Sequence, residues 1–370
     1  MKRASRLPQL ERRRLLGKLL AGAVVAPALV GRFAGGQVRA TPAASPTATA
    51  SPTPAASPNP LQDPPDLEIA WVCPMHPSYT SASAGTCPIC GMPLIETKPY
   101  DTRDFQLVFR TEPAAVRPGE KIRLFFTFLR PGTREVVKEF EIVHTKRFHL
   151  FIVSQDLEFF EHIHPTLRDD GIWTIETTVP KPGYYQVLCD VMPTGGTGQF
   201  LTAPLVTAGY DGDLADQGAH LEPDHLFSKS AGDMTVAISF DPPRPASCQY
   251  VHLNLSLTDT RTGRPVTDLQ TYLGQFSHML LMSEDLQYYV HSHPINLVVQ
   301  QEDPAAIPEY IIPPDADLDA IRGGPKVTFD ALMPKAGVFR AWVQFQRHNQ
   351  VRTVPITFSV ASGPAEPVLA

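Results

Sequence analysis

Apolar residues alternate with polar or less apolar ones in short runs through most of the chain after residue 100. One run extends from Ile122 to Phe128, and a second run with the same spacing extends from Val251 to Leu257. Successive side chains of a strand point to opposite faces, so this alternation predicts half-buried β-strands. Turns rich in Pro, Gly and Asp separate the runs, and no long amphipathic helix pattern is visible. We expect an all-β fold with tandem antiparallel sandwiches of immunoglobulin-like type, and a barrel as the alternative architecture.

The strand pattern occurs twice because the chain contains an internal repeat. The segment Phe148–Pro165 recurs without a gap as Ser277–Pro294, 129 positions later. Further on, Pro180–Gly183 aligns with Pro334–Gly337 at an offset of 154, which predicts a 25-residue insertion within residues 295–325. Such self-similarity indicates a duplicated structural unit of about seven strands. The predicted sandwiches span 101–210 and 231–362, with an acidic connector over 211–230.

Each copy carries three histidines in one predicted hairpin. They are His149, His162 and His164 in the first copy and His278, His291 and His293 in the second. If Gln155–Glu158 form a four-residue loop, His149 lies opposite His164, and His162 shares their face of the sheet. The three imidazoles would then be close enough to share one ion, at the surface of each sandwich. A register shifted by one residue would separate them.

The histidine triads favour a transition metal. Three neutral imidazoles suit Cu(II), Zn(II) or Ni(II), and copper competes most strongly on affinity. The structural alternative is that these histidines cap strands or lie in a polar seam, because duplication also copies structural residues. His144 lies near the first triad and is not counted as a ligand. Cys189 is expected to be a buried thiol, since Cys189–Met192 lacks the histidine of a blue-copper site.

A separate cluster of cysteines precedes the repeats. Three of the five cysteines lie within 18 residues, in the spacing Cys73-x2-His76 followed by Cys87-x2-Cys90. Two such knuckles bring four donors to the corners of a tetrahedron, a geometry that Zn(II) and related ions accept. A disulfide between Cys87 and Cys90, or a purely structural zinc, is the alternative.

The elements Cys-Pro-Met-His-Pro at Cys73–Pro77 and Cys-Pro-Ile-Cys-Gly-Met at Cys87–Met92 closely resemble the heavy-metal-binding domain. This domain is appended to copper-transporting P-type ATPases and to periplasmic adaptors of metal-efflux pumps. The resemblance covers about residues 70–97 of a module that we place at 67–100. It implies a bound transition metal ion, copper or zinc. The implied ligands are Cys73, Cys87 and Cys90, with His76 as the fourth and Met75 and Met92 as soft donors for Cu(I).

The N-terminal segment has the order of an export signal. Three arginines beginning at Arg12 precede an apolar run that ends at Val30, and small residues allow cleavage after Ala40. The paired arginines favour the twin-arginine route, with an ordinary secretory signal as the alternative. No later run is long enough to span a bilayer. Residues 41–66 are almost wholly Pro, Ala, Ser and Thr, which predicts a disordered linker.

Charge narrows the class of function. The net charge is −6 although the first forty residues hold nine Lys and Arg and one Glu, so the remainder is strongly acidic. That balance excludes a nucleic-acid partner and suits a protein that meets cations. We expect an exported copper- or zinc-binding protein of the periplasm, cell envelope or extracellular space, for metal capture, trafficking or resistance, with a metal-efflux or transport protein as partner. The alternatives are a metalloenzyme such as a copper oxidoreductase, and an envelope interaction protein with only structural metal. No Ser/His/Asp set or carboxylate pair accompanies the triads, which argues against the enzyme.

Overall fold

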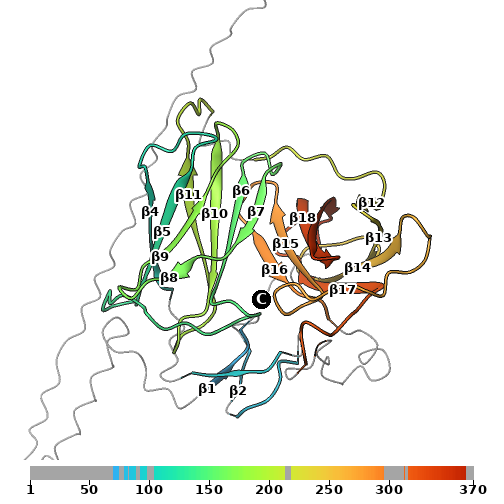
Figure 1. Cartoon of the computed structure of the whole chain (residues 1–370), viewed down its shortest axis with the longest axis horizontal. Coiled ribbons are helices and arrows are strands. Elements are labelled where there is room, and N and C mark those ends of the chain that lie inside the picture. The colour runs from blue at the N-terminus through green and yellow to red at the C-terminus, as the bar shows by residue number, and fades with distance from the viewer. Residues whose placement is uncertain are drawn as a thin grey trace, which may run out of the picture. The chain divides into compact units, whose positions relative to one another are not determined.

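The computed structural model describes residues 70–74, 79–81, 83–88, 92–97, 104–212, 218–295, 312 and 316–363. The predicted export signal, the linker and most of the predicted insertion lie outside the described residues, as do Met75, His76 and Cys90. Every helix or strand assigned in the described part is a β-strand (Figure 1). The predicted all-β class is therefore confirmed. No helix among the described residues is long and apolar enough to cross a membrane.

The first copy folds into two four-stranded antiparallel sheets, with orders β4-β5-β9-β8 and β11-β10-β6-β7. The alternating side chains of β5, such as Leu124 and Phe126, are fully buried and pack with Leu150 and Val187 of the other sheet. These two inner faces make the core of one sandwich. The strands are β4 (Gln106–Glu112), β5 (Ile122–Leu129), β6 (Phe148–Ser154), β7 (Phe160–Ile163), β8 (Thr166–Leu167), β9 (Trp173–Thr177), β10 (Tyr184–Val191) and β11 (Gln199–Val206).

The second copy has the sheets β12-β13-β14-β17 and β16-β15-β18-β19. It repeats the first copy except for one edge strand, because β12 pairs with β13 whereas β8 pairs with β9. Its core joins Leu253 and Leu255 of one sheet to Leu281 and Val343 of the other. The tandem sandwiches expected from the repeat are thus present. The strands are β12 (Ser228–Ala231), β13 (Met234–Asp241), β14 (Tyr250–Asp259), β15 (Ser277–Ser283), β16 (Tyr289–Ser292), β17 (Lys326–Leu332), β18 (Gly337–Arg347) and β19 (Gln350–Val360).

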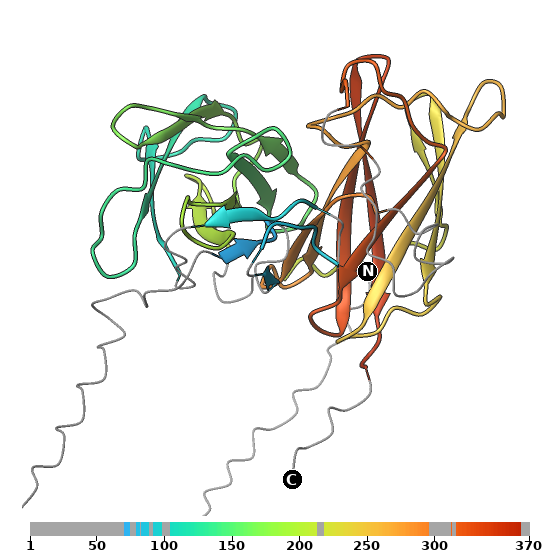
Figure 2. The same cartoon turned by 90° about the horizontal axis from the view of Figure 1, so that it is seen from below.

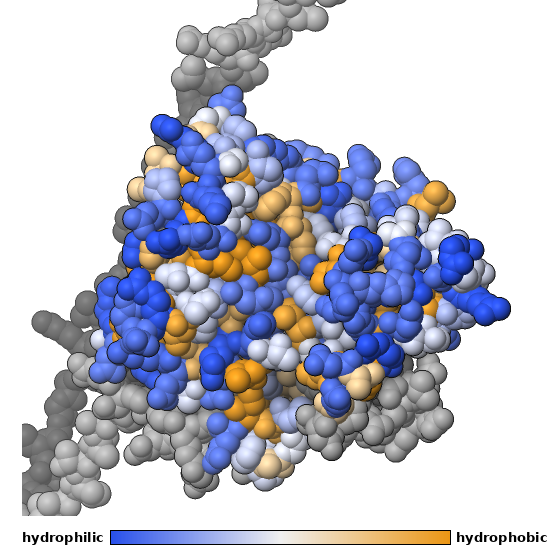
Figure 3. All heavy atoms as spheres, in the orientation of Figure 1, coloured by the Kyte–Doolittle hydropathy of each residue, from blue (hydrophilic) through white to orange (hydrophobic). Residues whose placement is uncertain are grey.

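The equivalent strands β6 and β15 are buried on both faces. Their outward-facing residues Phe151 and Leu280 belong to one apolar cluster that also contains Leu188 and Trp342. The Phe160 ring stacks on Trp342 with centroids 5.0 Å apart. Burial of this apolar surface holds the two sandwiches against each other, with β6 and β7 beside β15 and β16 (Figures 1 and 2). On the face drawn in Figure 3, hydrophilic residues predominate and hydrophobic ones occur in small groups.

The described part of the cysteine module forms a small antiparallel sheet. Its strands β1 (Ala70–Val72), β2 (Thr80–Ser81) and β3 (Ile95–Thr97) have the order β2-β1-β3. The side chain of Val143, from the first sandwich, packs against this module. The module therefore has an apolar contact with the segment that immediately precedes β6.

Candidate metal centre

The hairpin register places the histidines of each copy side by side. In the first copy Phe151 pairs with His162, and the amide of Ser154 donates to the carbonyl of Phe159 at 3.1 Å. In the second copy Leu280 pairs with His291 in the equivalent register. The four-residue loop is therefore present in both hairpins. In this register His149 lies opposite His164, which is the residue immediately after β7.

One nitrogen from each histidine of a triad lies within 4.8 Å of the corresponding nitrogens of the other two, in both copies. In the first triad, His149 Nδ1 lies 3.1 Å from His162 Nε2 and 3.3 Å from His164 Nε2. Two metal–nitrogen bonds of about 2.0–2.1 Å at a tetrahedral angle separate their nitrogens by about 3.3 Å. The spacing of the nitrogens therefore fits ligands of a common ion.

The outer nitrogens of His149 and His162 in the first triad have hydrogen-bond partners, and the hydrogen bond to a backbone carbonyl fixes the tautomer of His149. His149 Nε2 donates to the carbonyl of Val143 at 2.9 Å, and His162 Nδ1 donates to Oε1 of Gln344 at 2.8 Å. In this orientation of the amide, Gln344 Nε2 donates to Thr353 Oγ1 at 3.3 Å. Each neutral ring then has a lone pair, not a proton, on its inner nitrogen. Two lone pairs 3.1 Å apart repel each other unless a cation lies between them.

The second triad repeats this arrangement with one change. His278 Nε2 donates to the carbonyl of Tyr272 at 2.8 Å, as His149 does to Val143. His291 Nδ1 contacts Asp190 Oδ2 at 2.6 Å, so a carboxylate replaces the amide of Gln344. The inner atoms His278 Nδ1 and His291 Nε2 are buried, and no described group forms a hydrogen bond with them. Both are oriented as metal ligands would be.

The expectation that the histidines lie at the surface is wrong. His149 and His278 are 2% and 1% exposed, because the hairpins lie where the two sandwiches meet. Burial, together with the neighbouring His291, lowers the pKa of His149 to about 4. Burial and His149 lower the pKa of His164 to about 3. Both rings are therefore neutral near pH 7, as metal ligands must be.

These pKa shifts predict acid sensitivity of the metal-free protein. An unfolded histidine binds a proton below about pH 6.5, whereas folded His149 resists protonation until about pH 4. The free energy of unfolding should thus be highest above pH 6.5 and should fall as the pH falls from 6.5 toward 4. Urea unfolding of chelator-treated protein at pH 7.5, 6.0 and 5.0 measures this. Equal unfolding free energies at the three pH values would contradict it.

The two triads also contact each other. The ring of His149 lies 5.2 Å from that of His291, and the ring of His162 lies 5.9 Å from that of His278, between ring centroids. Distances within a triad are similar, for example 5.4 Å between His149 and His162. His144 packs on the second triad, with its ring centroid 3.6 Å from that of His293. The sequence placed His144 near the first triad only.

Part of the cysteine module is described. Cys73 and Cys87 are fully buried in one cluster with Met92 and Leu94. The amide of Cys87 donates to the carbonyl of Met92 at 2.8 Å, and that of Cys73 donates to Tyr79 at 3.2 Å. These bonds tie each cysteine to a residue five or six positions further along the chain. His76, Cys90 and Met75 lie outside the described residues, so their part in the module stays a prediction.

Other reactive side chains have structural surroundings. Cys189 is buried in the first core and is not bonded to the exposed Cys248.

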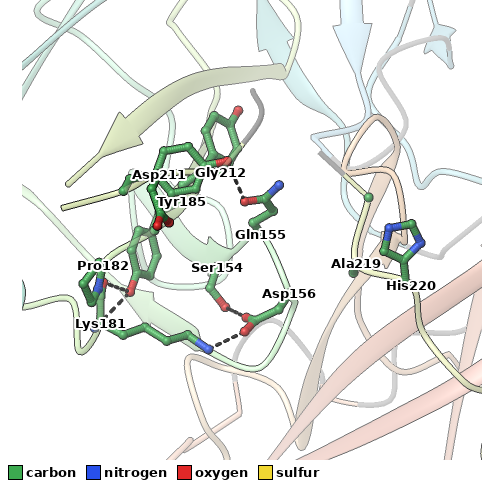
Figure 4. A pocket seen from close by; sticks show the side chains of 14 residues that line it. Ser154, Gln155, Asp156, Lys181, Pro182, Tyr185, Asp211, Gly212, Ala219 and His220 are labelled. Carbon is green, nitrogen blue, oxygen red and sulfur yellow. Dashed lines mark hydrogen bonds and ion pairs between the residues drawn. The ribbon is translucent and has the colours of Figure 1, made fainter. Parts of the chain in front are cut away.

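A cavity of about 350 Å³ is lined by the β6–β7 loop and by residues that follow β11 (Figure 4). Asp156, in the β6–β7 loop, accepts hydrogen bonds from the hydroxyl of Ser154 and from Lys181. These bonds stabilise the loop. Asp285 has the same contacts in the second copy. The carboxylates of Asp156 and Asp285 therefore stabilise the hairpin loops in which they lie.

Sequence reasoning did not identify Asp190 and Gln344 as partners of the histidines. They are equivalent residues, and each pairs across its own sheet with the first histidine of its triad, Asp190 with His149 and Gln344 with His278. Their side chains contact histidines of the other copy, 101 and 182 positions away. The available signal was the apolar run Leu150–Val153, which is typical of a strand buried on both faces.

Comparison with solved structures returns bacterial adhesins and other bacterial proteins at low similarity. They include the Escherichia coli adhesin FdeC (10% identity, 71% of this chain and 66% of that chain, TM-score 0.22). Others are the Yersinia pseudotuberculosis adhesin InvE (13%, 71% and 65%, TM-score 0.19) and a putative membrane anchored protein from Corynebacterium diphtheriae (11%, 76% and 63%, TM-score 0.20). The chain thus spans just under two thirds of each. These similarities are too low to inform function.

Family models give a firmer result. No curated protein matches the chain. The model described as "Heavy metal binding domain" matches residues 70–97, where the cysteine module resembles that domain. The model described as "Domain of unknown function (DUF8832)" matches residues 102–208 and 229–362, which coincide with the two sandwiches and make up well over half of the chain. The chain therefore belongs to the DUF8832 family and carries a heavy metal binding domain in front of its two sandwiches.

Proposed function

We propose that this chain is an exported protein that binds transition metal ions, copper first among them, at the cysteine module and at both histidine triads. The observation that carries the proposal is the pair of inward lone pairs of His149 and His162, 3.1 Å apart in a buried site. His164 Nε2 also lies 3.3 Å from His149 Nδ1, so three ring nitrogens converge at this point. The outer nitrogens of His149 and His162 contact the carbonyl of Val143 and Oε1 of Gln344 instead.

Binding accounts for these residues better than catalysis does. The carboxylate nearest the rings, Asp190, is engaged with His291, while Asp156 and Asp285 hold hairpin loops. The ring of Tyr272 lies beside the second triad, with its centroid 5.5 Å from that of His278, and burial raises the pKa of its hydroxyl. This hydroxyl is therefore protonated near pH 7 and is no general base there. We therefore propose metal capture or trafficking in the cell envelope, with a metal-efflux or transport protein as the receiving partner.

Export and metal loading can be tested together. Replacing Arg12→Lys and Arg13→Lys should hold the precursor in the cytoplasm, because the twin-arginine route requires the arginine pair. Cell fractionation locates the protein, and elemental analysis of protein purified from the envelope counts its metal. A matched variant, Arg3→Lys with Arg6→Lys, should be exported normally. Export of the first variant through the general route would refute the twin-arginine proposal, and metal-free native protein would refute the binding function.

A further inference from the structure

Each triad has one histidine whose hydrogen-bond partner belongs to the other sandwich. Gln344 belongs to the second sandwich, and its Oε1 accepts a hydrogen bond from His162 Nδ1 in the first. Asp190 belongs to the first sandwich and contacts His291 in the second. The repeat relates Gln344 to Asp190, so these are two copies of one contact related by approximate twofold symmetry. Each sandwich therefore orients a histidine of the other sandwich's triad.

The distances are short enough for two ions to affect each other. The rings of His149 and His291 belong to different triads and have centroids 5.2 Å apart. An imidazole ligand holds its metal about 3 Å from the ring centre, so ions in the two triads would be at most about 12 Å apart. Histidine rings from both triads fill the space between them. Among the described residues, the rings of the two triads contact each other directly.

The two sites are not equivalent in charge. A carboxylate that accepts the outer proton of a ligating histidine raises the basicity of the ring, and its removal typically costs 10- to 100-fold in affinity. His291 has this partner in Asp190, with 2.6 Å between the contacting atoms. The equivalent partner of His162 is the neutral amide of Gln344. The second triad should therefore bind a divalent cation more tightly than the first.

We propose that the six triad histidines form one two-metal centre shared by both sandwiches, in which the Asp190-oriented site fills first. This rests on the proposed metal binding by the triads. It adds that Asp190 and Gln344 are positioning residues acting across the interface, and that the first ion weakens binding of the second by charge repulsion. Because ligands and their orienting groups come from different sandwiches, metal binding also favours the docked arrangement of the two.

The probe is Cu(II), titrated into the full chain and followed by electron paramagnetic resonance. Thiols that would reduce Cu(II) are first removed by Cys73→Ser, Cys87→Ser, Cys90→Ser and Cys248→Ser. The first equivalent should give the spectrum of an isolated ion, and the second should broaden the signal or lower its intensity through interaction between nearby ions. In this background Asp190→Asn should weaken the first binding step about 10- to 100-fold. Asp169→Asn, at an exposed aspartate of the same sandwich, is the matched control and should change neither step.

The outcomes separate this inference from the proposed function. Two bound ions with additive, non-interacting spectra would overturn the shared centre and leave metal binding intact. So would an unchanged first affinity in the Asp190→Asn protein. A single ion that is lost equally from His149→Ala and His278→Ala proteins would overturn the two-metal arrangement. No bound copper at all would overturn metal binding by the triads themselves.

Discussion

Replacing His149 and His278 together should lower the number of metal ions bound by the sandwiches from two to zero. Each of these two histidines supplies one of the three ring nitrogens that converge in its triad. Two remaining imidazoles bind a divalent ion far more weakly than three, so the ions should be lost on desalting. Elemental analysis after loading with Zn(II), in a chain that also carries Cys87→Ser, counts the ions that remain. Undiminished binding would contradict the assignment of the triads as ligands.

The burial of these histidines requires a control for folding. Alanine at position 149 removes a buried ring and its hydrogen bond to the carbonyl of Val143, which keeps the bond from the amide of Lys146. Loss of that one hydrogen bond costs about 0.5–1.5 kcal/mol in the free energy of unfolding. His164→Ala avoids this problem, because His164 is only partly buried and has no outer partner of this kind among the described residues. That single variant should lose one ion and stay folded. His252→Ala changes a strand histidine outside the triads and should retain both ions.

Cys87→Ser should abolish metal binding by the cysteine module while the sandwiches keep theirs. Cys87 is fully buried with Cys73, and its amide donates to the carbonyl of Met92. A serine hydroxyl is a poor ligand for Zn(II) or Cu(I) compared with a thiolate, so the module should lose its ion. The module's ligands are separate from the triads, so the fold of the sandwiches should be unaffected.

The measurement is the metal content of the Cys87→Ser protein beside that of Cys248→Ser. Cys248 is an exposed cysteine of the second sandwich and serves as the matched control. We expect one ion fewer per molecule in the first variant and no change in the second. Full metal content in the Cys87→Ser protein would remove Cys87 from the set of ligands. Loss from both variants would point to thiol oxidation.

The local geometry of the site could be predicted from the sequence, because it depends on local features. The hairpin register follows from the number of residues between His149 and His164, and the loop beginning at Ser154 closes as that number requires. The duplication shows that both hairpins share this register. The all-β class follows from the alternation of apolar residues in β5 and β14, whose apolar positions are buried.

The surroundings of the site could not be predicted in the same way. The partners of His162 and His291 are far away in the sequence and lie in the other sandwich. The pattern of apolar residues within one strand does not indicate whether the outer face of its sheet is covered by another domain, or by which one. The apolar residues Phe151 and Trp342 on the outer faces decide this through packing between the copies. That packing turned two expected surface sites into one buried cluster.

Anomalous diffraction from crystals of the metal-loaded protein tests the central claim most directly, because it locates each ion relative to the side chains. Data collected at the absorption edge of copper or zinc should show two peaks at the sandwich interface. One peak should lie about 2 Å from His149 Nδ1, and the other about 2 Å from His291 Nε2. Fully loaded crystals with no peak near either triad, or with peaks only at the cysteine module, would contradict the account.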